Sequence, residues 1–89
     1  MVADPHSRRP ALFMRAEELR AQSQALREQV AELADAVAEV EQDVARVLED
    51  LAEQGGPLAA QAREHANRAR EVAARERAEA QRLRRAAPS

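Results

Sequence analysis

Large apolar residues recur every seven positions along residues 12–51, a pattern typical of a coiled-coil helix. One row starts at Leu12 and a second row lies four residues after it, which are the d and a positions of a heptad repeat. Each row has six positions. Ten of these twelve positions carry Leu or Val, although the whole chain has only 15 such residues. We name these ten residues the seam: Leu12, Leu19, Leu26, Val30, Leu33, Val37, Val40, Val44, Val47 and Leu51.

Glycine and proline divide the chain into two helical segments. Neither residue occurs within residues 11–54 or 58–87, and almost every residue there favours a helix. Between the two segments lies Gly55-Gly56-Pro57, in which Gly can stop one helix and Pro can open the next. The sequence therefore predicts an all-α, two-helix antiparallel hairpin. Its expected parts are a flexible lead over 1–10, a coiled-coil helix over 11–54, a turn over 55–57, a helix over 58–87 and a tail over 88–89.

Alanine forms a second repeat of seven residues. We name it the Ala face: Ala31, Ala38, Ala45, Ala52, Ala59, Ala66, Ala73 and Ala80. If the chain folds back at the two glycines, these residues face one another in pairs whose numbers total 111. Small side chains let two helices approach closely. We therefore expect the two helices to pack against each other through the Ala face.

The charges of the two segments are complementary. Residues 11–54 carry a net charge of −7, and residues 57–89 carry +4. Four arginines flank the Ala face of the second segment, and each is expected to pair with an acid at the same level of the first. The expected pairs are Arg63 with Glu49, Arg70 with Glu41, Arg77 with Asp35, and Arg84 with Glu28. Exposed ion pairs contribute only about 0–1 kcal/mol each, so these pairs would set the register of the helices rather than their stability.

The second helix cannot cover the seam. Its only large apolar residues are Leu58, Val72 and Leu83, and the Ala face lies roughly 100° around the first helix from the centre of the seam. Proteins rarely leave a long apolar stripe uncovered. We therefore expect a partner, which is either a second copy of the chain or a helix of another protein, so that a homodimer would form a four-helix arrangement.

For a second copy, the charges beside the seam favour an antiparallel pair. Facing a and d residues then have numbers that total 63, Arg15 meets Asp50, and Arg20 meets Glu41. A parallel pair would instead bring Arg15 near Arg20. One conflict arises, because Glu41 is also expected to pair with Arg70 of its own chain.

The chemistry of catalysis or ligand binding finds little support. The chain has no Cys, and its two histidines, His6 and His65, lack the spacing of metal ligands. Acids such as Glu39 and Asp43 are expected on a solvated face. We expect no enzymatic activity, no cofactor, no metal and no small-molecule ligand.

Three functions fit these patterns. The preferred hypothesis is a non-catalytic coiled-coil protein that dimerises or acts as a scaffold through the seam. A second is a regulatory, antitoxin-like binder whose seam captures a partner helix. A third is a nucleic-acid-associated protein that contacts phosphates through the basic row Arg68, Arg75 and Arg82, although Glu64 four residues before Arg68 favours an ordinary solvated face. With no long apolar run and no pattern of a secretion signal in the sequence, we expect no membrane association and a cytoplasmic location.

Overall fold

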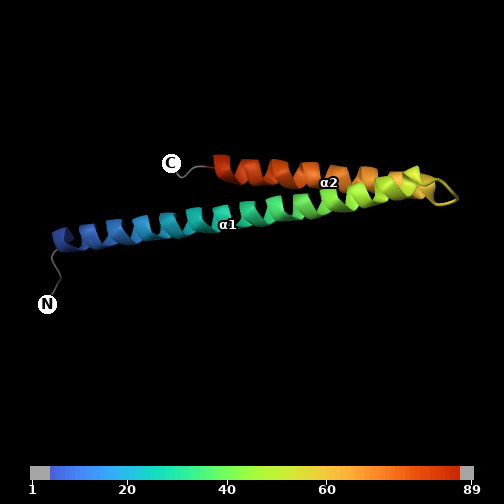
Figure 1. Ribbon diagram of the computed structural model, residues 1–89. Helices are drawn as coiled ribbons and strands as arrows, with labels where there is room; N and C mark the ends of the chain where they lie inside the picture. The colour runs from blue at the N-terminus through green and yellow to red at the C-terminus, as the bar shows by residue number, and fades with distance from the viewer. Residues whose placement is uncertain (1–4, 87–89) are drawn as a thin grey trace.

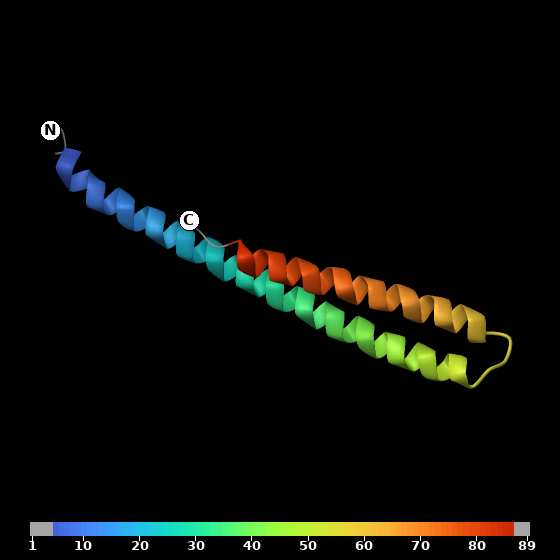
Figure 2. The same cartoon turned by 90° about the horizontal axis from the view of Figure 1, so that it is seen from above.

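The protein is a rod made of two helices. The computed structural model describes the backbone of residues 5–86 and the side chains of residues 9–86. Helix α1 (Pro5–Glu53) and helix α2 (Ala59–Arg85) lie side by side and run in opposite directions (Figures 1 and 2). This arrangement confirms the predicted all-α antiparallel hairpin. The rod measures 83 × 19 × 13 Å, with a radius of gyration of 23.0 Å, whereas a globular chain of this length has about 12 Å.

Helix α1 begins earlier than the sequence suggested. It starts at Pro5 instead of residue 11, so Pro10 lies at the sixth helical position and not in the first turn. Pro5 occupies the first position, where a missing backbone N–H breaks no hydrogen bond. The expected lead over 1–10 is therefore corrected for residues 5–10, which are helical. Residues 1–4 lie outside the described part of the chain.

The turn between the helices depends on the two glycines. Gly55 has φ +78° and Gly56 has φ +89°, a left-handed conformation that strains residues with a side chain. The N–H of Gly55 donates to the carbonyl of Ala52 (3.1 Å), which closes the end of α1.

Proline 57 belongs to this turn and does not open α2. The N–H of Ala59 donates to the carbonyl of Gly56 (3.3 Å) across Pro57 and Leu58, and α2 begins at Ala59. Pro57 therefore occupies the second position of a four-residue turn, for which its fixed φ is suited. The observed turn is longer than the predicted turn over 55–57 by one residue at each end. Helix α2 ends at Arg85. Residues 87–89, where we expected the last helical residue and the tail, lie outside the described part.

The buried side chains between the helices are all alanines, within the part of the chain that the structure describes. Each is at most 6% exposed: Ala31, Ala34, Ala38, Ala45, Ala52, Ala62, Ala66, Ala69, Ala73 and Ala80. Seven of the eight Ala-face residues are in this set, and the eighth, Ala59, is half-buried beside the turn. Ala31 clusters with Ala80, and Ala45 clusters with Ala66. These contacts agree with the expected register, in which the numbers of two facing residues total 111.

Three of the buried alanines were not part of the expected Ala face. Ala34, Ala62 and Ala69 lie three residues from members of it, and residues three apart are neighbours on a helix. Leu48 and Leu83 pack against these alanine clusters from the side. The contact between α1 and α2 is therefore two rows wide on each helix.

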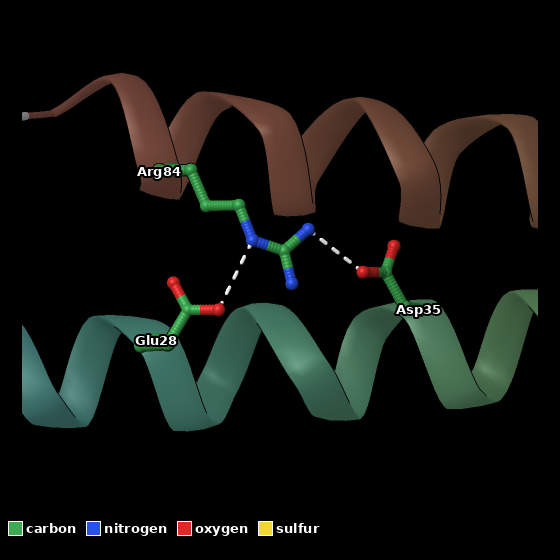
Figure 3. A network of polar contacts seen from close by, with 3 residues as sticks. All are labelled: Glu28, Asp35 and Arg84. Atoms are coloured by element: carbon green, nitrogen blue, oxygen red, sulfur yellow. Dashed lines mark hydrogen bonds and ion pairs between the residues drawn. The ribbon is translucent and has the colours of Figure 1, made fainter.

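Arginines of α2 bind acids of α1 along one edge of this contact. Arg84 donates to Asp35 (2.7 Å) and to Glu28 (3.2 Å), as Figure 3 shows. Arg70 pairs with Glu49. These hydrogen bonds, with Asp35 first, raise the pKa of the Arg84 guanidinium above its ordinary value.

Only one of the four expected ion pairs forms as predicted, which is Arg84 with Glu28. Arg70 binds Glu49 instead of Glu41, and Arg84 also binds Asp35, which was assigned to Arg77. Side chains on a helix lean toward its N-terminus. In an antiparallel hairpin the arginines therefore lean toward the turn and the acids lean away from it, so an arginine can reach an acid nearer the turn than its own level, as Arg84 reaches Asp35. Among the described residues, Arg63 and Arg77 make no ion pair.

Replacing Ala38 with Leu should destabilise the hairpin. Ala38 is fully buried between the helices, and three added carbons cannot be accommodated without moving α2 away. We expect a loss of about 1–3 kcal/mol, as is usual for overpacking. Thermal unfolding followed by circular dichroism measures it, with the exposed Ala74→Leu as the matched control. Equal melting temperatures for the two variants would contradict the alanine packing.

Replacing Arg84 with Gln should loosen the last turns of α2. The variant loses both carboxylate contacts at the end of the hairpin, so amides of residues 80–85 should exchange with solvent faster. Since the pKa of Arg84 is raised, the loss of its own charge removes this contribution only as the pH rises above the ordinary arginine value. Arg75→Gln is the control, because Arg75 makes no contact with α1 among the described ion pairs. If both variants exchange alike, the Arg84 contacts do not hold the end of α2.

Candidate functional site

The seam lies exposed along the length of α1. Each of its ten residues keeps between 37% and 67% of its surface exposed. No large apolar side chain in the described part of the chain is fully buried. The hairpin therefore buries methyl groups and leaves its leucines and valines in contact with solvent.

The two rows of the seam differ in exposure. The d residues, such as Leu33 at 65% and Val47 at 67%, are the most exposed. The a residues of the same stretch are less so, with Val37 at 37% and Val44 at 41%. Going around α1 from the buried alanines, the row of Ala34 and Leu48 comes first, then the a row, then the d row. Helix α2 thus shields one edge of the seam and leaves the other edge open.

Helix α2 adds apolar surface to the shielded edge. Leu58 is 60% exposed, and Val72 is half-buried. Both lie on the row of α2 next to Ala62 and Ala69, on the side of the contact away from the Arg84 ion pairs. A partner helix that fills the seam would therefore reach the flank of α2 at these residues.

Near the turn, the seam includes a shallow apolar depression. It is lined by Val40, Val44, Val47 and Leu48, with Asp43 at its edge. Leu48 packs against the alanines Ala45, Ala66 and Ala69 between the helices and also lines this depression, so it connects the interior of the hairpin to the seam. An apolar side chain of a partner helix can insert here between successive valines, as a knob does in a coiled coil.

The N-terminal part of α1 extends beyond α2. The Nη1 group of Arg27 donates to the carbonyl of Ala86 (3.3 Å), which places the end of α2 beside Arg27. Residues 5–26 of α1 therefore have no helix of the same chain beside them (Figure 2). This overhang, about 33 Å long at 1.5 Å per residue, carries Leu12, Leu19 and Phe13, which are 56–64% exposed.

The basic row Arg68, Arg75 and Arg82 lies on the face of α2 directed away from α1. Arg68 binds Glu64 (2.8 Å) and Arg82 pairs with Glu79 within the same helix. Their side chains are 62% and 75% exposed. Two of the three positive charges are thus balanced locally, as on an ordinary solvated helix face.

None of the acids considered for chemistry is buried in the described part of the chain. Glu39 is exposed, Asp43 binds Arg46 (3.4 Å), and Glu41 is half-buried beside α2. No cluster of three or more His, Cys, Asp or Glu that could hold a metal ion occurs among the described residues. His65 is exposed on α2, and the side chain of His6 lies outside the described part. Over the same part, neither helix has a stretch long and apolar enough to cross a membrane.

Comparisons with protein-family models, with curated proteins and with solved structures found no match to this chain. The surface itself therefore supplies the argument for function. Its main features are a long apolar seam on the acidic helix α1 and a helix α2 that covers only one edge of that seam.

Proposed function

We propose that the protein is a non-catalytic coiled-coil protein that joins protein chains through the seam of α1. The observation that carries this proposal is the exposure of all ten seam residues, whereas the buried side chains of the described residues are all alanine. A partner helix that packs knobs into the seam would remove these side chains from water.

The hairpin buries small apolar side chains and leaves large ones exposed. Burying a Leu or Val side chain contributes about 1.5–3 kcal/mol, whereas a methyl group contributes roughly a third to a half of that. Burial of the ten leucines and valines of the seam would therefore contribute most of the stabilisation that the chain can gain from apolar side chains. Helix α2 is not placed to bury them. Association with another helix supplies this free energy.

The heptad spacing supports a helix as the partner. A small ligand needs a concave pocket, but the seam is an open stripe on one helix, and its apolar residues recur at the spacing of a coiled-coil contact. An antitoxin-like binder would use the same surface with a different protein as partner. The basic row of α2 gives less support to nucleic-acid binding, because Arg68 and Arg82 already bind glutamates of their own helix.

Replacing Leu33 with Asp should abolish association. Leu33 is 65% exposed in the middle of the seam, so the change hardly disturbs the hairpin but places an unpaired carboxylate in the contact. Sedimentation at tens of micromolar should report a multimer for the native chain and a monomer for the variant. The matched control is Ala25→Asp, which adds the same charge on the exposed outer face of α1.

Two results would overturn the proposal. One is a native chain that stays monomeric alone and binds no helical protein from its own cells. The other is a Leu33→Asp variant that associates as strongly as the control.

A further inference from the structure

We infer that the occupant of the seam is a second copy of this chain, which runs antiparallel with facing residue numbers that total 63. This inference rests on the proposed function and adds the identity and orientation of the partner. It places Leu12 of one copy against Leu51 of the other and brings the overhang of each copy onto the hairpin part of its partner.

The first argument is the fit of side chains across the seam. The a and d rows are interrupted at two places, where Ala16 and Ser23 stand in place of Leu or Val. In the antiparallel register, Ala16 faces Val47 and Ser23 faces Val40, so every layer contains at least one large apolar side chain. In a parallel pair, Ala16 faces Ala16 and Ser23 faces Ser23, and two layers are left underpacked.

The second argument is a carboxylate that the hairpin leaves without a counter-ion. Glu41 is half-buried beside α2, and among the described residues it makes no ion pair. It lies on the seam side of the buried alanines, in the row of Ala34 and Leu48, whereas Arg70 binds Glu49 on the other side. In the antiparallel register, Glu41 faces Arg20 of the second copy, whose guanidinium binds Glu17 of its own helix (2.7 Å) and remains 50% exposed for a second carboxylate. The arginine expected to compete for Glu41 is thus engaged elsewhere, and the conflict noted in the sequence does not arise.

The third argument is that the remaining flanking residues also match. Arg15 and Asp50, which make no ion pair among the described residues, face each other across the open edge of the seam. Phe13, which is 64% exposed, faces the half-buried Leu48 across the shielded edge. A parallel pair would instead place Arg15 near Arg20, and Leu48 near Asp43. The chain is therefore complementary to itself in one orientation and not in the other.

A disulfide experiment tests the orientation and the register, because the chain has no cysteine of its own. Ser23→Cys and Val40→Cys variants are mixed in a glutathione redox buffer, and the products are identified by intact mass. The antiparallel register brings the two introduced thiols together across one layer, within the range that a disulfide can span. We expect the mixed 23–40 disulfide as the main product. Main products of 23–23 and 40–40 would show a parallel pair and overturn the inference.

A charge experiment tests the Glu41 contact separately. Glu41→Arg places arginine opposite Arg20 at two symmetric sites, and we expect the dissociation constant of the dimer to rise about tenfold at low salt. Adding Arg20→Glu to the same chain should restore the native value. Glu39→Arg makes the same charge change at an exposed residue away from the seam and should have little effect. Equal effects of Glu41→Arg and Glu39→Arg, or no rescue, would overturn the inference.

The experiments distinguish a failure of this inference from a failure of the proposed function. A dimer with the wrong disulfides, or a native chain that is monomeric alone but binds another helical protein through the seam, leaves the proposed function intact and overturns this inference. A chain that neither self-associates nor binds a helical protein overturns both.

Discussion

Among the described residues, the side chains buried between α1 and α2 are limited to the methyl groups of alanine, and this limit determines the rest of the molecule. Two helices separated only by alanine side chains lie close together, so that any larger residue between them must move a whole helix. The rows on either side of the alanines can hold larger residues, and there Leu48, Leu83 and the arginines reach across. Large and charged side chains can therefore lie only on the rows beside the buried alanines.

The same limit separates two tasks on α1. One face holds α2 through small residues, and the neighbouring face carries the leucines and valines. If α2 had packed on the seam, its three large apolar residues would have left most of those side chains without neighbours. Because α2 packs on the Ala face, it does not cover the seam and shields only part of the a row. A chain of 89 residues thereby combines a self-contained hairpin with a long apolar stripe.

Much of the fold could be predicted from the sequence, because breakers and repeats mark it directly. Gly55 and Gly56 indicate the turn, and the Ala repeat indicates both the packing face and the register of 111. The start of α1 was harder, because Pro10 suits a first helical turn and only backbone geometry shows that the helix already begins at Pro5.

The ion pairs and the exposed fractions of the seam residues could be found only from the three-dimensional structure. Matching residues by level assumes side chains perpendicular to the helix axis, and it ignores that Glu41 lies on the seam side of the alanines whereas Arg70 and Glu49 lie on the other side. The lower exposure of the a row depends on which side of the seam α2 occupies, and heptad spacing alone does not reveal this. The ten seam residues themselves follow from the heptad pattern, but their role in binding a partner stays a prediction.

The fixed register of the hairpin also implies an order in which the chain closes. Ala52 and Ala59, beside the turn, are only seven residues apart in sequence, whereas Ala31 and Ala80 are 49 apart. Joining distant residues costs more loop entropy, but each pair that forms shortens the loop that the next pair must close. Once the two glycines reverse the chain, α2 can therefore close onto α1 in the manner of a zipper, and it opens from its C-terminal end. Arg84, which binds Glu28 and Asp35, lies at the end of α2 that closes last and opens first.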